Sequence, residues 1–270
     1  FDNMKSFFLG NGFTDIVDFK DIENPKFVGS WGASDEDLFT QADKELTKLN
    51  NSGKPFFSFI FTSSNHDPFE IPDNIVTPIS YTKEQLAQYD TKELSRHQAI
   101  QYADYALGKF IDKAKTQSYW QDTIFLIVAD HDARALGSDL VPINNFHIPG
   151  VILNSGSEQQ MDERIVSQID LAPTLLSLMG VENYSPMIGH DLNIKTNGGR
   201  AMMQYSDNFA YMENNAVVIL QPQKPPLSFS YDIDKNLLSP SNNNIELADK
   251  TLAHGLWGSL AYENEWYSQP

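Results

Sequence analysis

The sequence predicts an α/β fold, in which a mostly parallel sheet is sandwiched by helices and a small antiparallel sheet lies near the C-terminus. Residues 56–62 and 123–129 are almost continuously apolar, aromatic or β-branched, which is typical of strands buried on both faces of a parallel sheet. A segment with helical periodicity lies between them. Residues 201–232 instead hold short strand-like runs without intervening helices. This order predicts helices on both faces of one sheet, followed by an antiparallel edge.

The first half of the chain alternates strands and helices. A short strand is expected at residues 26–30. Ser34 is expected to cap a helix that runs to about Leu49, because three acidic residues follow it and favour a helix N-terminus. After the strand at 56–62, an irregular proline-rich segment precedes a long amphipathic helix, which is indicated by apolar residues at helical spacing over residues 99–114.

The second half begins with the buried strand at 123–129. The elements after it are predicted from shorter apolar stretches. They are a short strand at 150–153, a helix at 165–179, three or four short strands within 201–232 and a closing helix at 245–261. No linker rich in proline, glycine or serine divides the chain, so one domain is expected over residues 1–270. Within it, residues 1–200 form the α/β core, and residues 201–270 add the antiparallel strands and the closing helix.

Composition excludes several classes of protein. The 270 residues include 19 Lys and Arg against 36 Asp and Glu, a net charge of −17. This balance argues against nucleic acid as a partner and against simple docking to anionic lipid. There is no cysteine, which removes disulfides, thiolate zinc sites and cysteine nucleophiles. No apolar run is long enough to span a bilayer, and no signal peptide opens the chain. The first residue is Phe1, which suggests a piece of a longer protein.

Asp130 and His131 give the strongest chemical signal. A carboxylate and an imidazole follow a buried strand directly, and ligands of open α/β sheets bind beyond the carboxyl ends of strands. Asp oxygen and His nitrogen together suit a divalent cation such as Mn, Mg or Zn. The alternative is structural, with Asp130 capping a turn and His131 as an ordinary loop histidine.

Three further residues are candidates for substrate binding. His66 follows the other buried strand, and it is expected to bind phosphate or to act in acid–base chemistry in a crevice shared with Asp130 and His131. The alternative for His66 is an incidental histidine in an Asx-type turn. Arg134 is placed to clamp an anion, and His147 precedes the next strand. Each of these last two also has a simple structural reading.

Taken in order, these blocks resemble the sulfatase/alkaline-phosphatase superfamily, and within it the lipoteichoic acid synthase-like, phosphoglycerol transferase branch. The resemblance covers most of the chain. Its blocks are Gly29-Ser30-Trp31-Gly32-Ala33-Ser34-Asp35-Glu36-Asp37, Ser64-Asn65-His66-Asp67-Pro68, Ala129-Asp130-His131, His147-Ile148-Pro149-Gly150, Asp170-Leu171-Ala172-Pro173-Thr174 and Gly189-His190-Asp191-Leu192.

The resemblance implies an alkaline-phosphatase-like fold and a metal-dependent phosphoryl transferase, or a phosphate or sulfate ester hydrolase, of the cell envelope. It implies that Asp130 and His131 bind one divalent cation and that His66 contacts the transferred phosphate. The substrate is expected to be a phosphate ester or lipid headgroup. The implied location is the periplasmic or extracytoplasmic face of the bacterial inner membrane, with membrane attachment only through a segment absent from this chain.

Two departures from the family pattern limit what carries over. The Thr or Ser nucleophile and an acidic metal ligand lie upstream of the Trp-Gly block in the family, so they are expected to precede Phe1. The family's Phe-Trp-Asn-Arg stretch is replaced by Phe1-Asp2-Asn3-Met4, which leaves the headgroup open. A second hypothesis therefore stands beside the enzyme: a non-catalytic anion-binding module or pseudo-enzyme with the same fold.

Overall fold

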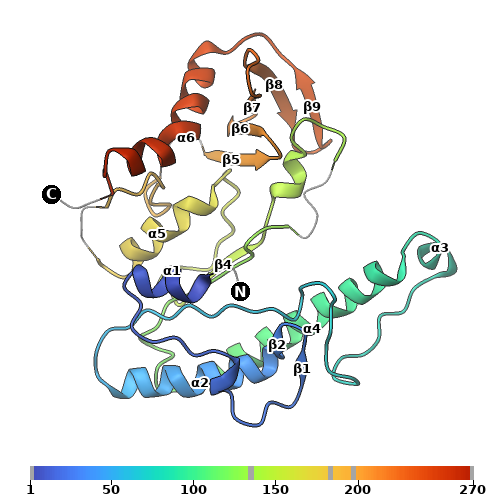
Figure 1. Ribbon diagram of the computed structural model, residues 1–270, viewed down its shortest axis with the longest axis vertical. Helices are drawn as coiled ribbons and strands as arrows, with labels where there is room; N and C mark the ends of the chain where they lie inside the picture. Colours follow the sequence, from blue (N-terminus) through green and yellow to red (C-terminus); the bar gives the residue numbers. More distant parts are fainter. Residues whose placement is uncertain (1–2, 133–136, 182–184, 196–198, 268–270) are drawn as a thin grey trace. The chain divides into compact units, whose positions relative to one another are not determined.

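The computed structural model describes residues 3–132, 137–181, 185–195 and 199–267. The chain divides into two compact units, Phe1–Thr123 and Ile124–Pro270. The first is coloured blue to teal and the second green to red in Figure 1. The expected division into residues 1–200 and 201–270 stays a prediction.

Two long helices, α2 (Asp35–Asn51) and α4 (Thr91–Ala114), form the body of the first unit (Figure 1). Ser34 caps α2 as predicted, because its hydroxyl accepts a hydrogen bond from the Asp37 amide. Between the helices, the rings of Phe39 and Phe110 stack with centroids 4.7 Å apart. Of the alanines of α4 predicted to face the core, Ala99, Ala106 and Ala114 are buried and Ala103 is partly buried.

The first unit also contains several short elements. Strands β1 (Val28–Gly29) and β2 (Gly32–Ala33) form a small antiparallel hairpin where the sequence predicts a strand. Helix α1 (Met4–Gly10), the 3₁₀ turn η1 (Phe19–Asp21) and helix α3 (Lys83–Leu86) were not predicted.

The predicted buried strand at residues 56–62 is not a strand here. It forms no ladder among the residues that the structure describes, and Phe57, Phe59 and Phe61 are 60%, 52% and 49% exposed. Rings near the N-terminus reach only part of it: Phe8 lies 5.2 Å from Phe59, and Phe13 lies 5.7 Å from Phe57, between centroids. An apolar run becomes a buried strand only when neighbouring strands complete its hydrogen bonds.

The second unit opens with an antiparallel ribbon of β3 (Phe125–Val128) and β4 (Gly150–Leu153), in which Val128 lies opposite Gly150. The positions of both strands are predicted, but the full burial of 123–129 is not found, because Val128 is 38% exposed. Every strand pair among the described segments is antiparallel, so these segments do not form the parallel pairing that was expected between the two apolar runs.

The predicted helix at 165–179 is shorter than expected. A 3₁₀ turn, η3 (Gln168–Asp170), leads into α5 (Leu171–Leu178). Pro173 lies in the first turn of α5, where its missing N–H breaks no helical hydrogen bond. The helical spacing therefore predicts α5, but the proline and the capping residues decide where it begins.

The predicted antiparallel region is a five-stranded meander in which each strand pairs with the next. Its strands are β5 (Arg200–Tyr205), β6 (Asn208–Glu213), β7 (Ala216–Leu220), β8 (Leu227–Asp232) and β9 (Leu237–Pro240). The sequence predicts β5, β7 and β8, but not the exact extent of the meander. Helix α6 (Ile245–Glu263), predicted at 245–261, contacts β6 and β7 and covers one face of the sheet (Figure 1).

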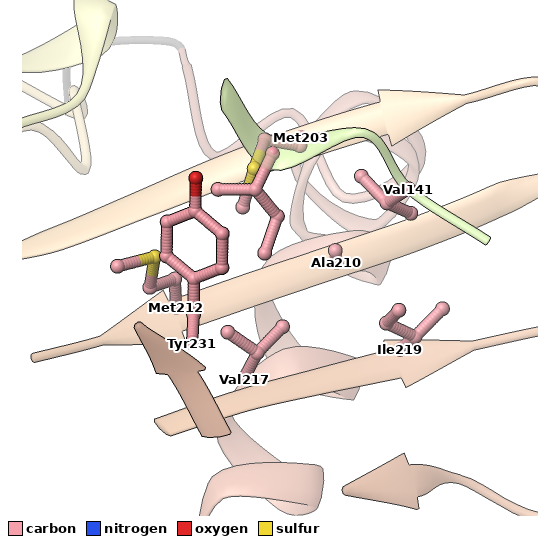
Figure 2. Packing of buried hydrophobic residues seen from close by; sticks show 8 residues of the cluster. Val141, Met203, Ala210, Met212, Val217, Ile219 and Tyr231 are labelled. Carbon is pink, nitrogen blue, oxygen red and sulfur yellow. The ribbon is translucent and has the colours of Figure 1, made fainter. Parts of the chain in front are cut away.

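Alternating side chains give this sheet two buried faces. On one face, Tyr211 and Val218 pack against Leu247 of α6. On the other, Val217 and Ile219 join a cluster that Val141 completes from the segment before η2 (Ile143–Phe146). Figure 2 shows this cluster with Met203, Ala210, Met212 and Tyr231. Burial on both faces gives the sheet a core of its own within the second unit.

None of the helices in the described part of the chain is long and apolar enough to cross a membrane.

Candidate active site

His66 lies in the loop that follows residues 56–62. Its Nδ1 is 2.9 Å from the Asp67 carbonyl oxygen. A carbonyl only accepts, so Nδ1 carries the hydrogen and Nε2 keeps a lone pair. The ring also packs against Trp31, with centroids 4.2 Å apart. The loop thus sets both the tautomer and the orientation of the His66 ring.

Trp31 strengthens the same arrangement from the β1–β2 turn. Its Nε1–H donates to the Asp67 carbonyl oxygen at 2.7 Å, so one oxygen accepts from both aromatic side chains. The Asp67 carboxylate forms an ion pair with Lys92 of α4 at 3.0 Å. The β1–β2 turn and α4 therefore both hold the segment that bears His66.

A small concave pocket opens beside His66. Trp31, Ser64, His66 and Glu70 are among its lining residues. The Ser30 amide donates to Glu70 Oε2 at 2.6 Å, and hydrogen bonds from Ser30 lower the pKa of the Glu70 carboxyl. The Glu70 carboxylate therefore adds a negative charge to the lining of the pocket that also contains His66.

Asp35, at the first position of α2, holds the beginning of the His66 loop. It is 1% exposed, and its Oδ1 accepts hydrogen bonds from the Ser63 and Ser64 amides, both at 3.0 Å. The Asp35 amide donates in return to Ser64 Oγ at 3.0 Å. Asp35 Oδ2 has no hydrogen-bond partner among the residues that the structure describes. The acidic residues after Ser34 predict the helix N-terminus, but they give no signal for this second role.

The Asp130–His131 turn follows β3, as predicted. The His131 amide donates to Asp130 Oδ1 at 2.8 Å, and His131 Nδ1 lies 2.8 Å from the Asp132 carbonyl oxygen. Nδ1 therefore carries the hydrogen, which leaves the Nε2 lone pair for another partner. Both side chains are exposed, at 65% and 75%.

The donor atoms of this turn fit a divalent cation. Asp130 Oδ2 and His131 Nε2 are 3.5 Å apart. Oxygen and nitrogen ligands about 2.1 Å from a tetrahedral zinc ion are separated by roughly 3.4 Å. The carboxylate and the imidazole are also the ligand types that Mn and Zn accept. Within the described segments, no group of three or more acidic or histidine side chains is placed to hold a metal.

Gln168 holds the same turn from η3, a contact that the sequence does not suggest. Its Nε2 donates to the carbonyl oxygens of Ala129 and Asp130 at 3.0 Å and 3.1 Å. A side-chain amide that donates to two successive carbonyls leaves no periodic pattern in the sequence, which is why it was missed.

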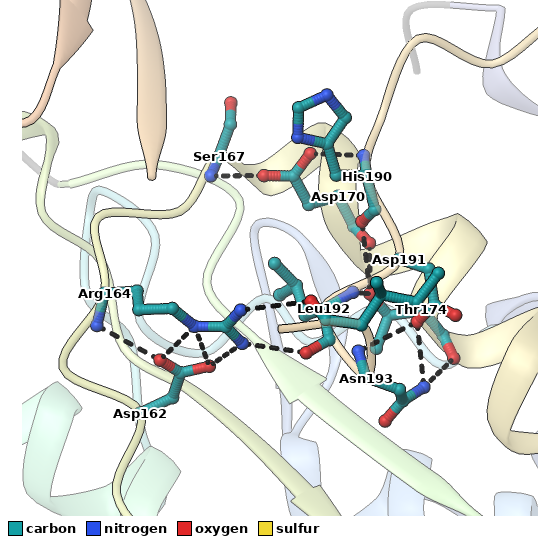
Figure 3. A network of polar contacts seen from close by, with 10 residues as sticks. Asp162, Arg164, Ser167, Asp170, Thr174, His190, Asp191, Leu192 and Asn193 are labelled. Atoms are coloured by element: carbon teal, nitrogen blue, oxygen red, sulfur yellow. Dashed lines mark hydrogen bonds and ion pairs between the residues drawn. The ribbon is translucent and has the colours of Figure 1, made fainter. Parts of the chain in front are cut away.

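A buried ion pair anchors η3. The Asp170 and Arg200 side chains are 2% and 5% exposed and lie 2.8 Å apart. Asp170 also accepts hydrogen bonds from the Ser167 and His190 amides, as Figure 3 shows. Arg164 pairs with Asp162, and its guanidinium also donates hydrogen bonds to the carbonyl oxygens of Leu192 and Ile194. This network joins η3 to β5 and to the segment around His190.

The other predicted residues are placed as follows. His147 is exposed and follows η2. Because the Ala129 amide bonds the Pro149 carbonyl, His147 lies at the end of the β3–β4 ribbon from which Asp130 also emerges. Arg134 lies outside the described residues, as do Phe1 and Asp2. That His66 shares a crevice with Asp130 and His131 stays a prediction, since they belong to separate units.

Comparison with known proteins identifies a consistent set of relatives. A family model described as Sulfatase matches residues 1–181. Among curated proteins, the chain is 29% identical to a lipoteichoic acid synthase-like protein, YvgJ, of Bacillus subtilis, over 76% of this chain and 34% of that protein. It is 22% identical to phosphoglycerol transferase I of Salmonella arizonae, over 84% of this chain and 29% of that protein.

Solved structures give the same result. An alkaline phosphatase superfamily protein from Vibrio parahaemolyticus is 47% identical, with a TM-score of 0.91 over 100% of this chain and 64% of its own. The lipoteichoic acid synthase LtaP of Listeria monocytogenes is 22% identical, with a TM-score of 0.75 over 98% of this chain and 66% of its own. These neighbours confirm the predicted fold class. The chain spans about a third of the curated relatives' length and about two thirds of the solved chains.

Proposed function

The chain belongs to the sulfatase family, and from this premise we propose that it forms part of a metal-dependent phosphoryl-group transferase of the cell envelope. The names of its relatives, lipoteichoic acid synthase and phosphoglycerol transferase, support transfer of a phosphate ester over hydrolysis of a sulfate. The substrate we propose is a phosphate ester or lipid headgroup. The location we propose is the periplasmic or extracytoplasmic face of the bacterial inner membrane.

The observation that carries the proposal is the Asp130–His131 turn at the end of β3. Its two donor atoms lie 3.5 Å apart, and the Asp132 carbonyl fixes the histidine tautomer that leaves Nε2 to a ligand. In this proposal, Asp130 and His131 hold one divalent cation together with ligands from elsewhere in the full-length protein. When bound, the cation would stabilise negative charge on the phosphoryl oxygens and lower the pKa of an attacking hydroxyl.

His66 is proposed to act on the transferred phosphate. Because Nδ1 is held by the Asp67 carbonyl, Nε2 is the atom that faces a substrate. It accepts the proton of a hydroxyl group, and the resulting imidazolium donates to a phosphoryl oxygen. Trp31 fixes the ring plane during this exchange. Arg134 and His147 are proposed as further substrate contacts.

The attacking hydroxyl is proposed to come from outside residues 1–270. The best-placed candidates in the chain have structural bonds instead: Ser34 caps α2, Ser64 bonds Asp35, and Thr174 bonds the Asp170 carbonyl. Covalent phosphoryl transfer needs a nucleophile within about 3–3.5 Å of phosphorus. We therefore expect residues 1–270 alone to show no turnover of p-nitrophenyl phosphodiesters with Mn²⁺. Turnover that disappears in His131→Ala would overturn this assignment.

The test of the function uses the full-length protein. Metal content is measured by mass spectrometry, and transfer is measured with a phosphoglycerol lipid donor, for the wild type and for Asp130→Ala/His131→Ala. We expect the double variant to lose both Mn²⁺ or Zn²⁺ uptake and activity, while Lys224→Ala, a change in the β7–β8 turn, keeps both. Equal metal content in the double variant would remove the metal assignment. Metal uptake without any turnover would favour the non-catalytic anion-binding module.

A further inference from the structure

The Gln168 side chain donates two hydrogen bonds to the backbone of the Asp130–His131 turn, one to the Ala129 carbonyl and one to the Asp130 carbonyl. Its Nε2 lies 3.0 Å from the first carbonyl oxygen and 3.1 Å from the second. An amide NH₂ group has two hydrogens, so it can donate to both carbonyls at once. These two bonds set the direction of the peptide planes on either side of the Asp130 Cα.

Hydrogen bonds within the Asp130–His131 turn already orient the Asp130 carboxylate and the His131 imidazole. The His131 amide bonds Asp130 Oδ1, and His131 Nδ1 bonds the Asp132 carbonyl. These bonds orient the two side chains relative to their own backbone. They do not orient that backbone relative to the rest of the unit, and both side chains are more than half exposed. A fixed site therefore needs a contact to a rigid element.

Gln168 belongs to such an element. It is the first residue of η3, and its neighbours Ser167 and Asp170 are buried. The Asp170 carboxylate accepts the Ser167 amide and pairs with the Arg200 guanidinium of β5. Breaking a buried, hydrogen-bonded ion pair is costly, so η3 has little freedom to move relative to the five-stranded sheet.

We propose that Gln168 is a positioning residue for metal binding, which fixes the Asp130–His131 turn to the Asp170–Arg200 anchor. This inference rests on the proposed function, because it takes Asp130 and His131 as metal ligands. Gln168 does not itself contact the cation. Its role is to hold the backbone from which the two ligands project, so that they are in place before the cation arrives.

Groups that orient metal ligands without touching the metal usually change its affinity by about 10–100-fold when they are replaced. In Gln168→Ala the two carbonyls lose their donor. In Gln168→Glu a carboxylate of nearly the same shape faces two carbonyl oxygens and can donate to neither, so the variant separates hydrogen bonding from packing. Gln221→Ala is the matched control. Gln221 follows the last residue of β7, and its Nε2 donates to Asn208 Oδ1 of β6, away from the Asp130–His131 turn.

The experiment measures Mn²⁺ binding to the full-length protein by electron paramagnetic resonance of the free ion. We expect the dissociation constant to rise about 10–100-fold in both Gln168 variants, to stay within about twofold in Gln221→Ala, and to be immeasurably weak in His131→Ala. In the transfer assay, we expect Gln168→Ala to need a higher Mn²⁺ concentration for half-maximal activity. At saturating Mn²⁺ its kcat should return to the wild-type value. A purely structural role would instead lower thermal stability and leave the Mn²⁺ dissociation constant unchanged.

A second measurement, on metal-free protein, keeps this inference separate from the proposed function. Amide hydrogen exchange at His131 is expected to be faster in Gln168→Ala than in the wild type and the Gln221→Ala control. Wild-type affinity for Mn²⁺ in both Gln168 variants, or unchanged exchange at His131, overturns the role of Gln168. If the wild type itself binds no Mn²⁺ while exchange at His131 responds to Gln168, then Gln168 holds the turn, and it is the metal assignment of the proposed function that is wrong.

Discussion

Asp35 and Ser64 bond one another in both directions: the Asp35 amide donates to Ser64 Oγ, and the Ser64 amide donates to Asp35 Oδ1, each at 3.0 Å. The first residue of a long helix is thereby joined to the loop that bears His66. A carboxylate that accepts two backbone amides makes charge-assisted hydrogen bonds, which are stronger than neutral ones. The hydrogen bonds of the buried Asp35 carboxylate thus stabilise the loop that bears His66.

Asp35→Ala should destabilise the protein by about 2–4 kcal/mol, because it leaves the Ser63 and Ser64 amides without an acceptor in a buried place. Asp35→Asn keeps a carbonyl oxygen for these amides and should lose about half as much. Urea denaturation followed by circular dichroism measures both. A loss below about 0.5 kcal/mol in Asp35→Ala would contradict the role given to this carboxylate.

The Trp31→Phe variant tests whether the hydrogen bond from Trp31 to the Asp67 carbonyl contributes to transfer. The phenyl ring can still pack on His66, but the indole N–H that donates to Asp67 is gone. One hydrogen bond is worth about 0.5–1.5 kcal/mol, so we expect the transfer rate to fall roughly 3–10-fold. His66→Gln should reduce it by about 10²–10⁴-fold, the usual contribution of an acid–base group. Equal losses in the two variants would show that Trp31 does more than orient the ring.

Arg200→Met should destabilise the second unit strongly. It leaves the buried Asp170 carboxylate without its cation, which typically costs about 3–5 kcal/mol. Arg164→Met is the matched control, because its partner Asp162 is more exposed and such pairs contribute about 0–1 kcal/mol. Urea unfolding of the full-length protein compares the two, and similar effects in both variants would contradict the importance of burial here.

Tyr102 should titrate late in alkali. Burial is the main cause that raises the pKa of Tyr102 to about 12, and burial together with the bond to Asp43 also raises the pKa of Tyr119. Between about pH 10 and pH 12 the unfolded chain has lost the Tyr102 proton while the folded chain keeps it. The unfolded state then binds fewer protons, so the free energy of unfolding falls as the pH rises through this window.

The absorbance of tyrosinate, followed against pH, measures this effect. Tyr102→Phe should remove one group from the late phase of the titration and make the loss of stability above pH 10 less steep. An unchanged late phase in Tyr102→Phe would assign that phase to other tyrosines.

Local signals in the sequence predict much of this fold, while long-range pairing escapes them. Helix α2 follows from its cap and acidic first turn, α4 from helical spacing, and β4 from a short apolar run. The run at 56–62 has the composition of a buried strand, but composition does not supply the neighbours that a strand requires. Likewise, nothing local shows that β3 pairs antiparallel with β4.

The residues of the candidate site also differ in whether the sequence indicates them. The sequence indicates His66, Asp130 and His131 as candidates, because their side chains suit phosphate or metal binding and they follow apolar runs; their roles stay a prediction. Asp35 and Gln168 are not indicated, since their roles depend on which backbone groups the fold brings within hydrogen-bond distance. Residues that hold others in place have no fixed chemical type, and only the geometry identifies them.

The meander of β5 to β9 has a consequence for how the chain acquires its structure. Each strand pairs with the one that follows it, so every hairpin closes over a short stretch of chain at a small entropic cost. This sheet can assemble in quick successive steps once its strands have been synthesised, and α6 then covers it. The segment around Val141 lies about sixty residues earlier in the chain than the sheet. Its apolar side chains can be buried only after the sheet has formed. During translation, the apolar side chains of this segment stay exposed until the strands of the sheet have been made, and transiently exposed apolar surface favours aggregation.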